Sequence, residues 1–187
     1  SEDQKVLEAS QIDIDSENID TTLSNSLLTA EEPPADMFRS AQGRWGSGEV
    51  QIINVSMENE EGPSHVFHTG MRMTIRIHVS APKLIDDFVF GVSIFNAEGV
   101  CCYGTNTDIE AMVPETMVGD GEVIFNIEQL NLVEGTYKLD AAIHTRDGRP
   151  YDYHRLLYTF RVKSHTKDVG IYRPPHHWEF TPNICFR

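Results

Sequence analysis

The feature that most constrains this chain is a strict alternation of apolar and polar side chains over residues 71–80. Every second position is a large apolar residue, from Met71 to Val79, and polar residues such as Arg76 and His78 fill the positions between. Successive side chains of a β-strand point to opposite faces, so a period of two indicates a strand with one buried face. We therefore predict a half-buried strand here.

Six further segments have a similar character and are separated by short turn signals such as Asp147-Gly148. The seven predicted strands cover residues 50–57, 71–80, 87–95, 100–106, 122–127, 135–144 and 153–163. Short strands at close spacing, without a strong amphipathic helix between them, are typical of a β-sandwich or barrel. We predict an all-β fold, specifically an immunoglobulin-like antiparallel β-sandwich over residues 39–187. The paired cysteines of antibody domains are missing, so only the architecture is implied.

The formal net charge of −14 is unevenly distributed. Residues 1–36 hold ten acidic residues against one base, Lys5, and this polar stretch ends in Glu-Glu-Pro-Pro. Such a composition favours a linker, which we place at residues 1–38, and indicates a fragment cut from a longer chain. Nucleic acids and anionic membrane surfaces attract Lys and Arg clusters, so neither is an expected partner.

Three cysteines, Cys101, Cys102 and Cys185, show neither disulfide nor zinc-site spacing, which favours a reduced, cytoplasmic setting. No phosphate loop and no Gly-x-Ser-x-Gly nucleophile motif occurs. The eight histidines do not form a recognisable metal motif, and carboxylate pairs such as Asp108 and Glu110 are common in any acidic protein. We expect no catalytic residue, no metal and no cofactor.

Aromatic residues next to hydrogen-bonding ones recur near the predicted turns. They lie around Trp45, in residues 103–108 and in residues 151–154. An aromatic ring can stack on the C–H face of a sugar while amides and carboxylates pair with its hydroxyls. Packing of the same rings against the sandwich core is the alternative interpretation, and the residues alone do not decide between the two.

The same segments carry a resemblance to a known family. Residues 44–50 (RWGSGEV), 103–107 (YGTNT), 151–154 (YDYH) and 176–180 (HHWEF) resemble the C-terminal domain of Wzt-type proteins. Those proteins are ATP-binding subunits of bacterial ABC transporters that export O-antigen polysaccharide. The similarity spans residues 40–180 and includes several motifs in the same order.

The resemblance implies a carbohydrate-binding module that recognises the capped non-reducing end of lipid-linked O-antigen polysaccharide and so selects completed chains for export. Residues 1–38 would connect it to an upstream ATPase domain, in a protein peripheral to the inner membrane that acts with the transporter's membrane subunit. Motifs shared by the whole family are expected to be structural, so outward-facing positions become candidates for glycan contact. The candidates are Arg76, His78, Lys138, Asp140 and His144, with Tyr103, Asn106 and Tyr153 from the aromatic segments.

Two other functions are open at this point. A β-sandwich also serves in protein–protein assembly, and a glycan-modifying enzyme would need two carboxylates converging in a cleft. In addition, Pro174 and Pro175 precede the alternating Trp178 and Phe180, which favours a short strand after a hinge. We hypothesise that residues 168–187 are exchanged between the subunits of a homodimer, because exchange of an identical segment is a low-cost route to dimers.

Overall fold

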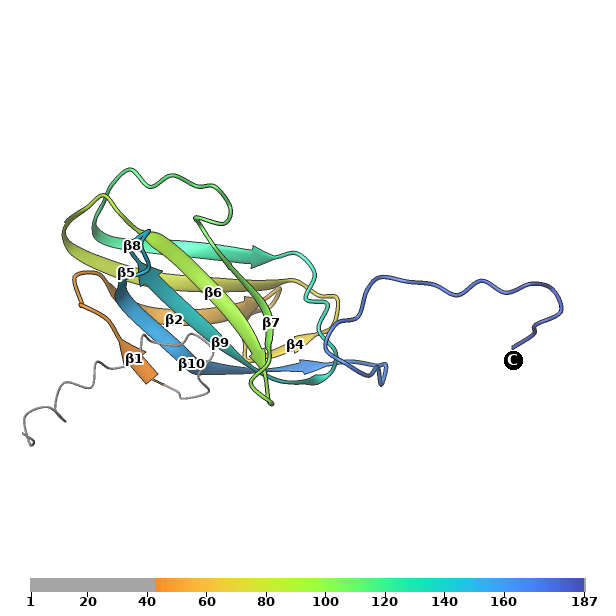
Figure 1. Ribbon diagram of the computed structural model, residues 1–187. Helices are drawn as coiled ribbons and strands as arrows, with labels where there is room; N and C mark the ends of the chain where they lie inside the picture. Colours follow the sequence, from red (N-terminus) through yellow and green to blue (C-terminus); the bar gives the residue numbers. More distant parts are fainter. Residues whose placement is uncertain (1–42, 187) are drawn as a thin grey trace, which may run out of the picture. The chain divides into compact units, whose positions relative to one another are not determined.

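The computed structural model describes residues 43–186, in which two β-sheets pack face to face (Figure 1). Sheet A has the strand order β1-β10-β9-β6-β7, with β4 also paired to β10, and sheet B has the order β3-β2-β5-β8. All pairs are antiparallel except the parallel pair β4–β10. The described residues contain no helix that could cross a membrane. The predicted all-β immunoglobulin-like sandwich is confirmed. The predicted linker at 1–38 lies outside the described residues.

Ten strands make up the two sheets. They are β1 (Gly43–Trp45), β2 (Gln51–Asn59), β3 (Gly62–Pro63), β4 (Val66–His68), β5 (Met73–Ile85), β6 (Val89–Asn96), β7 (Cys101–Asn106), β8 (Met117–Ile127), β9 (Gly135–His144) and β10 (Pro150–Lys163). All seven predicted strands are present with shifted ends. The three that sequence reasoning missed, β1, β3 and β4, have only two or three residues each, too few to display a period.

The core lies between the sheets and follows from the alternation. On β5, the residues from Met73 to Val79 that share its apolar side are all at most 3% exposed, and on β9 the same holds from Tyr137 to Ile143. Two facing sets of branched and aromatic side chains exclude water between the sheets, which supplies the main driving force for folding. Phe67 of the short strand β4 joins this core, which explains why so brief a strand is held in place.

Strand β10 is the longest strand and contains an irregularity. Its register against β9 shifts between His154 and Tyr158, and Leu156 within this bulge has a φ of 53°. A β-branched or bulky residue rarely adopts positive φ, so the surrounding structure must hold the bulge in place. The bulge is held by a hydrogen bond from the Leu156 N–H to Asp140, one of the predicted site residues.

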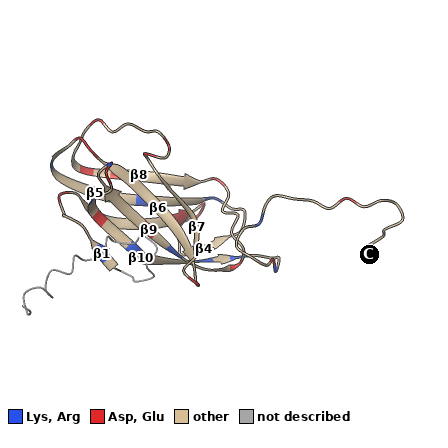
Figure 2. Ribbon diagram, in the orientation of Figure 1, with Lys and Arg blue, Asp and Glu red and all other residues tan. Residues whose placement is uncertain are grey.

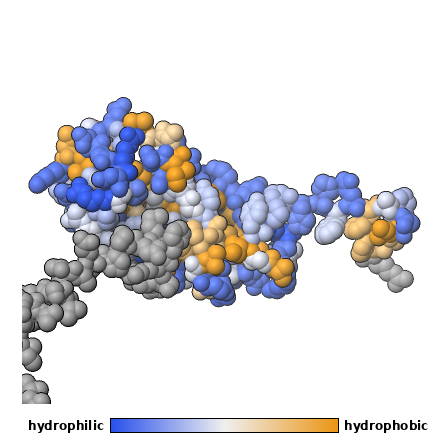
Figure 3. All heavy atoms as spheres, viewed as in Figure 1, coloured by the Kyte–Doolittle hydropathy of each residue, from blue (hydrophilic) through white to orange (hydrophobic). Residues whose placement is uncertain are grey.

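The C-terminal segment, residues 164–186, leaves the sheets without forming a strand (Figure 1). Its one ladder contact is an isolated bridge between Leu132 and Tyr172. The expected short strand at Trp178 and Phe180 is therefore wrong, because the segment does not lie beside a described strand edge with which it could form a ladder. Its side chains instead cluster among themselves: the rings of Trp178 and Phe180 stack, and Phe180 also contacts Phe186. Figure 3 shows this apolar cluster near the end of the segment.

Candidate functional site

The eight predicted site residues do not converge on one place. Arg76 and His78 lie on β5 and point outward from sheet B, because their neighbours Ile75 and Ile77 are buried. Five others point outward from sheet A, on the opposite side of the sandwich; they are Asn106, Lys138, Asp140, His144 and Tyr153. Tyr103 belongs to neither group, since it pairs with the core residue Ile94. The two groups therefore form two separate candidate surfaces.

On sheet B, the basic side chains are already paired with carboxylates. Arg76 donates from Nε to Glu58 Oε2 and from Nη1 to Glu122 Oε2, both at 2.9 Å. His78 Nε2 also lies 2.9 Å from Glu122. The hydrogen bond to Glu58 raises the pKa of Arg76 further. The charge of Arg76 is thus balanced within the sheet, and a ligand phosphate would have to compete with two carboxylates.

The sheet A face, defined here as the outward-directed residues of β1, β6, β7, β9 and β10, carries one row that crosses all five strands. Strand pairing places Asn106, Gly91, Ala142, Tyr153 and Trp45 side by side in this order. The second and third residues of the row, Gly91 and Ala142, have at most a methyl group as side chain. An amide therefore stands at one end of the row and two aromatic rings at the other, with little side-chain volume between them.

The neighbouring row repeats this pattern of small residues. Gly104 pairs with Ser93, and Ser93 pairs with Asp140. A Cβ atom at position 104 would come within 2.9 Å of Ser93 Oγ, so a larger residue there would require that hydroxyl to move, whereas a Cβ at Gly91 would make only ordinary contacts of 3.5 Å and more. The outward positions of β6 followed from its alternation, but their alignment with Asn106 and Tyr153 required the strand order.

The aromatic end of the row is a rigid stack. The rings of Trp45 and Tyr153 lie 4.7 Å apart between centroids with an interplanar angle of 8°. The Tyr153 hydroxyl donates to Asp140 Oδ2 at 3.2 Å, and burial raises the pKa of Tyr153 to about 12. This phenol stays protonated at neutral pH, so the pair presents an uncharged aromatic surface with a fixed orientation.

Asp140 is the predicted site residue whose burial the sequence did not indicate. It lies on the outward side of β9, as the alternation implied, but its exposure is only 1%. Its Oδ1 accepts the Leu156 backbone N–H at 2.6 Å, and its Oδ2 lies 3.5 Å from Arg155 Nη1. Asp140 thus holds the β10 bulge, and desolvation raises its pKa despite these partners. Its outward position agrees with the prediction, but the side chain is buried and bonded, so contact of Asp140 with a glycan stays a prediction.

Lys138 and His144 lie on either side of these rows, and both are half-buried. Lys138 pairs in register with Phe95, while His144 pairs with Val89. The His144 ring donates from Nδ1 to the Thr145 carbonyl at 2.7 Å, which leaves Nε2 as its second hydrogen-bonding atom. Together with Asn106, these two residues provide polar groups of different chemistry around the small-residue positions.

Two of the motifs singled out in the sequence meet in space. Arg44 donates two hydrogen bonds to Asp152, at 2.9 and 2.7 Å, and Asp152 also accepts the Ile52 N–H at 2.7 Å. A Cβ at Gly46 would lie 2.2 Å from the Tyr151 carbonyl oxygen, so this position demands glycine. These contacts join β1 and β2 to β10, which gives residues 44–50 and 151–154 a structural role.

His154 completes this buried network. Its Nδ1 lies 2.5 Å from the Tyr158 hydroxyl, while Nε2 is buried and makes no hydrogen bond, although Asp152 Oδ1 is 3.4 Å away. Desolvation lowers the pKa of His154 more than Asp152 raises it. The imidazole is therefore held in its neutral form at neutral pH.

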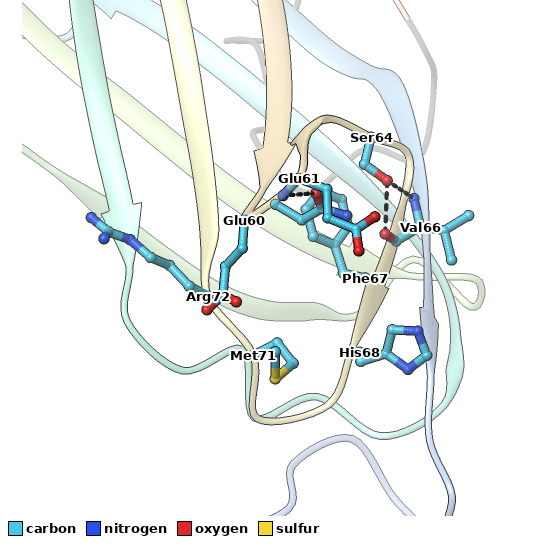
Figure 4. A pocket seen from close by; sticks show the side chains of 9 residues that line it. Glu60, Glu61, Ser64, Val66, Phe67, His68, Met71 and Arg72 are labelled. Atoms are coloured by element: carbon cyan, nitrogen blue, oxygen red, sulfur yellow. Dashed lines mark hydrogen bonds between the residues drawn. The ribbon is translucent and has the colours of Figure 1, made fainter.

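Two hollows lie away from the sheet A face. Tyr103 lines a largely apolar groove of about 400 Å³ between the edges of β7 and β8, with Phe125 and Tyr172 among its other residues. A second hollow of about 340 Å³ lies beside β4, and Figure 4 shows Glu60, Glu61 and His68 among the side chains that line it. Within residues 43–186, no group of three His, Cys, Asp or Glu side chains is arranged to hold a metal ion.

Comparison with known proteins identifies the family. Residues 41–174 match the family model described as the Wzt C-terminal domain. The chain is 30% identical over 136 residues to the O-antigen export system ATP-binding protein RfbB of Myxococcus xanthus, covering 72% of this chain but only 30% of that protein's length. A solved structure of the C-terminal domain of Wzt has a TM-score of 0.67 and 19% identity, covering 77% of this chain and 91% of the other. From these matches, we conclude that the chain belongs to the Wzt C-terminal domain family.

Proposed function

We propose that this domain is a non-catalytic carbohydrate-binding module that recognises the capped non-reducing end of lipid-linked O-antigen polysaccharide. In this role it selects completed chains for export. The family and the relative that is an O-antigen export ATP-binding protein support the polysaccharide as ligand. The observation that carries the proposal is the row across sheet A, where the amide of Asn106 and the Trp45–Tyr153 stack flank positions with minimal side chains.

This row has the chemical features that a sugar ring requires. Gly91 has no side chain to obstruct a ring, and Ala142 beside it is buried and carries only a methyl group. Tyr153 offers an aromatic edge, and Asn106, whose Oδ1 accepts the Ile109 N–H at 2.7 Å, offers its amide N–H groups to hydroxyl groups. Lys138 and His144 would contact substituents at the chain end. Each polar contact must replace a hydrogen bond to water, so we expect weak binding at a single site.

The proposal assigns the glycan to sheet A and not to sheet B. Five of the eight candidates share this face, and Asp140 supports it indirectly by fixing the Tyr153 hydroxyl. Arg76 and His78 are on the opposite side of the sandwich and are engaged by Glu58 and Glu122. At most one of these two groups of residues can form a given sugar site.

Direct titration of the chain with capped and uncapped O-polysaccharide tests the function. Preferential binding of the capped chain is expected, and equal binding of both would contradict recognition of the chain end. No binding to either polysaccharide would favour the alternative of an assembly domain. That alternative has support from the C-terminal segment, where Trp178 is 78% exposed and Phe186 is 74% exposed.

Two sets of variants locate the site. Gly91→Gln adds a side chain that the backbone tolerates, so it should block binding without unfolding the domain, and His144→Ala should weaken it. Arg76→Ala on sheet B is the matched control and should bind like the wild type. Loss of binding in Arg76→Ala, with wild-type binding in Gly91→Gln and His144→Ala, would move the site to sheet B.

In the complete protein, we propose that residues 1–38 connect this domain to an ATPase domain upstream, which hydrolyses ATP while the present domain performs no catalysis. The protein would sit on the cytoplasmic side of the inner membrane with the transporter's membrane subunit. We further propose a homodimer in which residues 168–187 are exchanged. Exposed apolar side chains at Trp178, Phe180, Ile184 and Phe186 support this, because burial against a second copy would remove them from water. Two sites in one dimer would strengthen attachment to chains that reach both.

A further inference from the structure

A hollow at the end of β4 and β10 differs in composition from the rest of this acidic protein. It has a volume of about 360 Å³, and no carboxylate lines it, although the chain contains 29 acidic residues against 15 basic ones. The lining side chains include two imidazoles, an ammonium group, a guanidinium group and three hydroxyls. They belong to His68, Thr69, Met71, Lys163, Ser164, His165, Thr166 and Arg173.

The parallel pairing of β4 with β10 brings these groups together. Lys163 and His68 are register partners, and the residues before them, Val162 and Phe67, are buried in the core. Apolar packing of these two neighbours in the core therefore fixes the backbone from which the outward side chains of Lys163 and His68 extend. After Lys163 the chain turns, and the ring of His165 stacks beside that of His68 with 6.3 Å between centroids.

Two nearby carboxylates are each paired with a base, and one of these bases, Arg173, also lines the hollow. Asp168 accepts hydrogen bonds from Arg173 and Thr166, and Glu134 accepts one from Lys167 at 2.7 Å. Among residues 43–186, no carboxylate lies within ion-pair distance of Lys163. Figure 2 shows the basic residues near β4 and at the start of the C-terminal segment.

We propose that this hollow binds a phosphate group. A phosphate presents oxygens in several directions and can accept from Lys163 on one side and from both imidazoles on the other, whereas a carboxylate has two oxygens in one plane. A phosphate monoester, with a second pKa of about 6, is largely a dianion at neutral pH and so suits a site lined by basic groups. Arg173, fixed by Asp168, closes the site from the C-terminal segment. The proposal does not depend on glycan binding at sheet A.

Titration of the 187-residue chain with inorganic phosphate at constant ionic strength tests this, followed through the histidine ring signals by NMR. Saturable shifts are expected at His68 and His165, while His176, which lies outside the hollow and bonds the Pro174 carbonyl, should not respond. Lys163→Ala should weaken binding about tenfold, the effect of removing one charge-assisted hydrogen bond. Lys83→Ala, an exposed lysine on β5, is the matched control.

Two further ligands identify the source of the phosphate. Binding of glucose 6-phosphate without binding to phosphatidylglycerol vesicles would assign the site to phosphorylated sugars, and the reverse would assign it to lipid headgroups. The proposal is overturned if phosphate causes no saturable shift at His68 and His165, or if Lys163→Ala binds phosphate as tightly as Lys83→Ala. Because Lys163 is exposed and makes no side-chain hydrogen bond to residues 43–186, thermal unfolding of its variant should match the wild type.

Discussion

Replacing Asp140 by Ala separates a structural role of this carboxylate from a role in binding. The change removes the acceptor of the Leu156 N–H, and an unsatisfied buried donor costs about 1–3 kcal/mol. It also removes an anionic neighbour of Arg155, whose side chain is 3% exposed. Breaking a buried pair from one side costs roughly 3–5 kcal/mol in all. We expect the free energy of unfolding to fall by about this amount.

Denaturant unfolding followed by circular dichroism measures the loss, and a fall in Tm of roughly 10 °C should accompany it. Asp140→Asn is the graded control, because its amide oxygen can still accept from Leu156 while the charge is lost, so its destabilisation should be smaller. Asp120→Ala, which removes an exposed partner of Ser80, should stay within about 0.5 kcal/mol of the wild type.

Wild-type stability in Asp140→Ala would refute this reasoning. If that variant were stable and yet bound no glycan, Asp140 would be a ligand-contacting residue, as the outward position on its strand first indicated. If it is destabilised while Asp140→Asn still binds glycan, the carboxylate acts by holding the β10 bulge and the Tyr153 hydroxyl.

Three other predictions follow from the structure. Because the pKa of His154 is lowered in the folded state, the unfolded state takes up the proton first as pH falls. The free energy of unfolding should therefore decrease as pH drops below about 6.5 toward the folded pKa. His154→Gln should flatten this part of the pH profile of unfolding, and an unchanged profile would contradict the prediction. Trp45→Ala should cost about 0.5–1.5 kcal/mol for the lost stack with Tyr153, beyond the area it buries, and should weaken glycan binding. Truncation after Arg173 should convert the proposed dimer to a monomer in sedimentation experiments, and a truncated chain that remains dimeric would place the interface elsewhere.

The two outer faces of the sandwich differ in how their charged groups are arranged, and therefore in the ligands that each could bind. On sheet B, Arg76 is bonded to two carboxylates, so its outer face is a self-contained polar network. On sheet A, uncharged groups such as Asn106 and Tyr153 flank small residues, and basic groups gather toward Lys163. A neutral sugar and an anionic group would therefore find suitable partners on the same sheet, at different ends.

The local pattern of the chain was enough to predict seven of the ten strands, the fold class and the buried side of β5 and β9. Alternation on β5 and β9 assigned the core correctly, because burial of one face imposes a period of two. The family resemblance, carried by residues 44–50 and 151–154 among others, was also visible in the sequence. The structure shows why these two motifs go together: Arg44 and Asp152 form a bonded pair across β1, β2 and β10.

The tertiary structure alone decided which outward residues share a face. Alternation assigns a side chain to one side of its own strand, but strand order and register determine which strands are neighbours, and those depend on contacts between distant segments. For this reason the candidates Arg76 and Lys138 lie on opposite faces, and Gly91 and Ala142 emerged as central positions only when the strands were aligned. Asp140 shows the same limit. Its outward direction on β9 could be predicted from the sequence, but its burial could not, because that burial arises from the bulge of a different strand, β10.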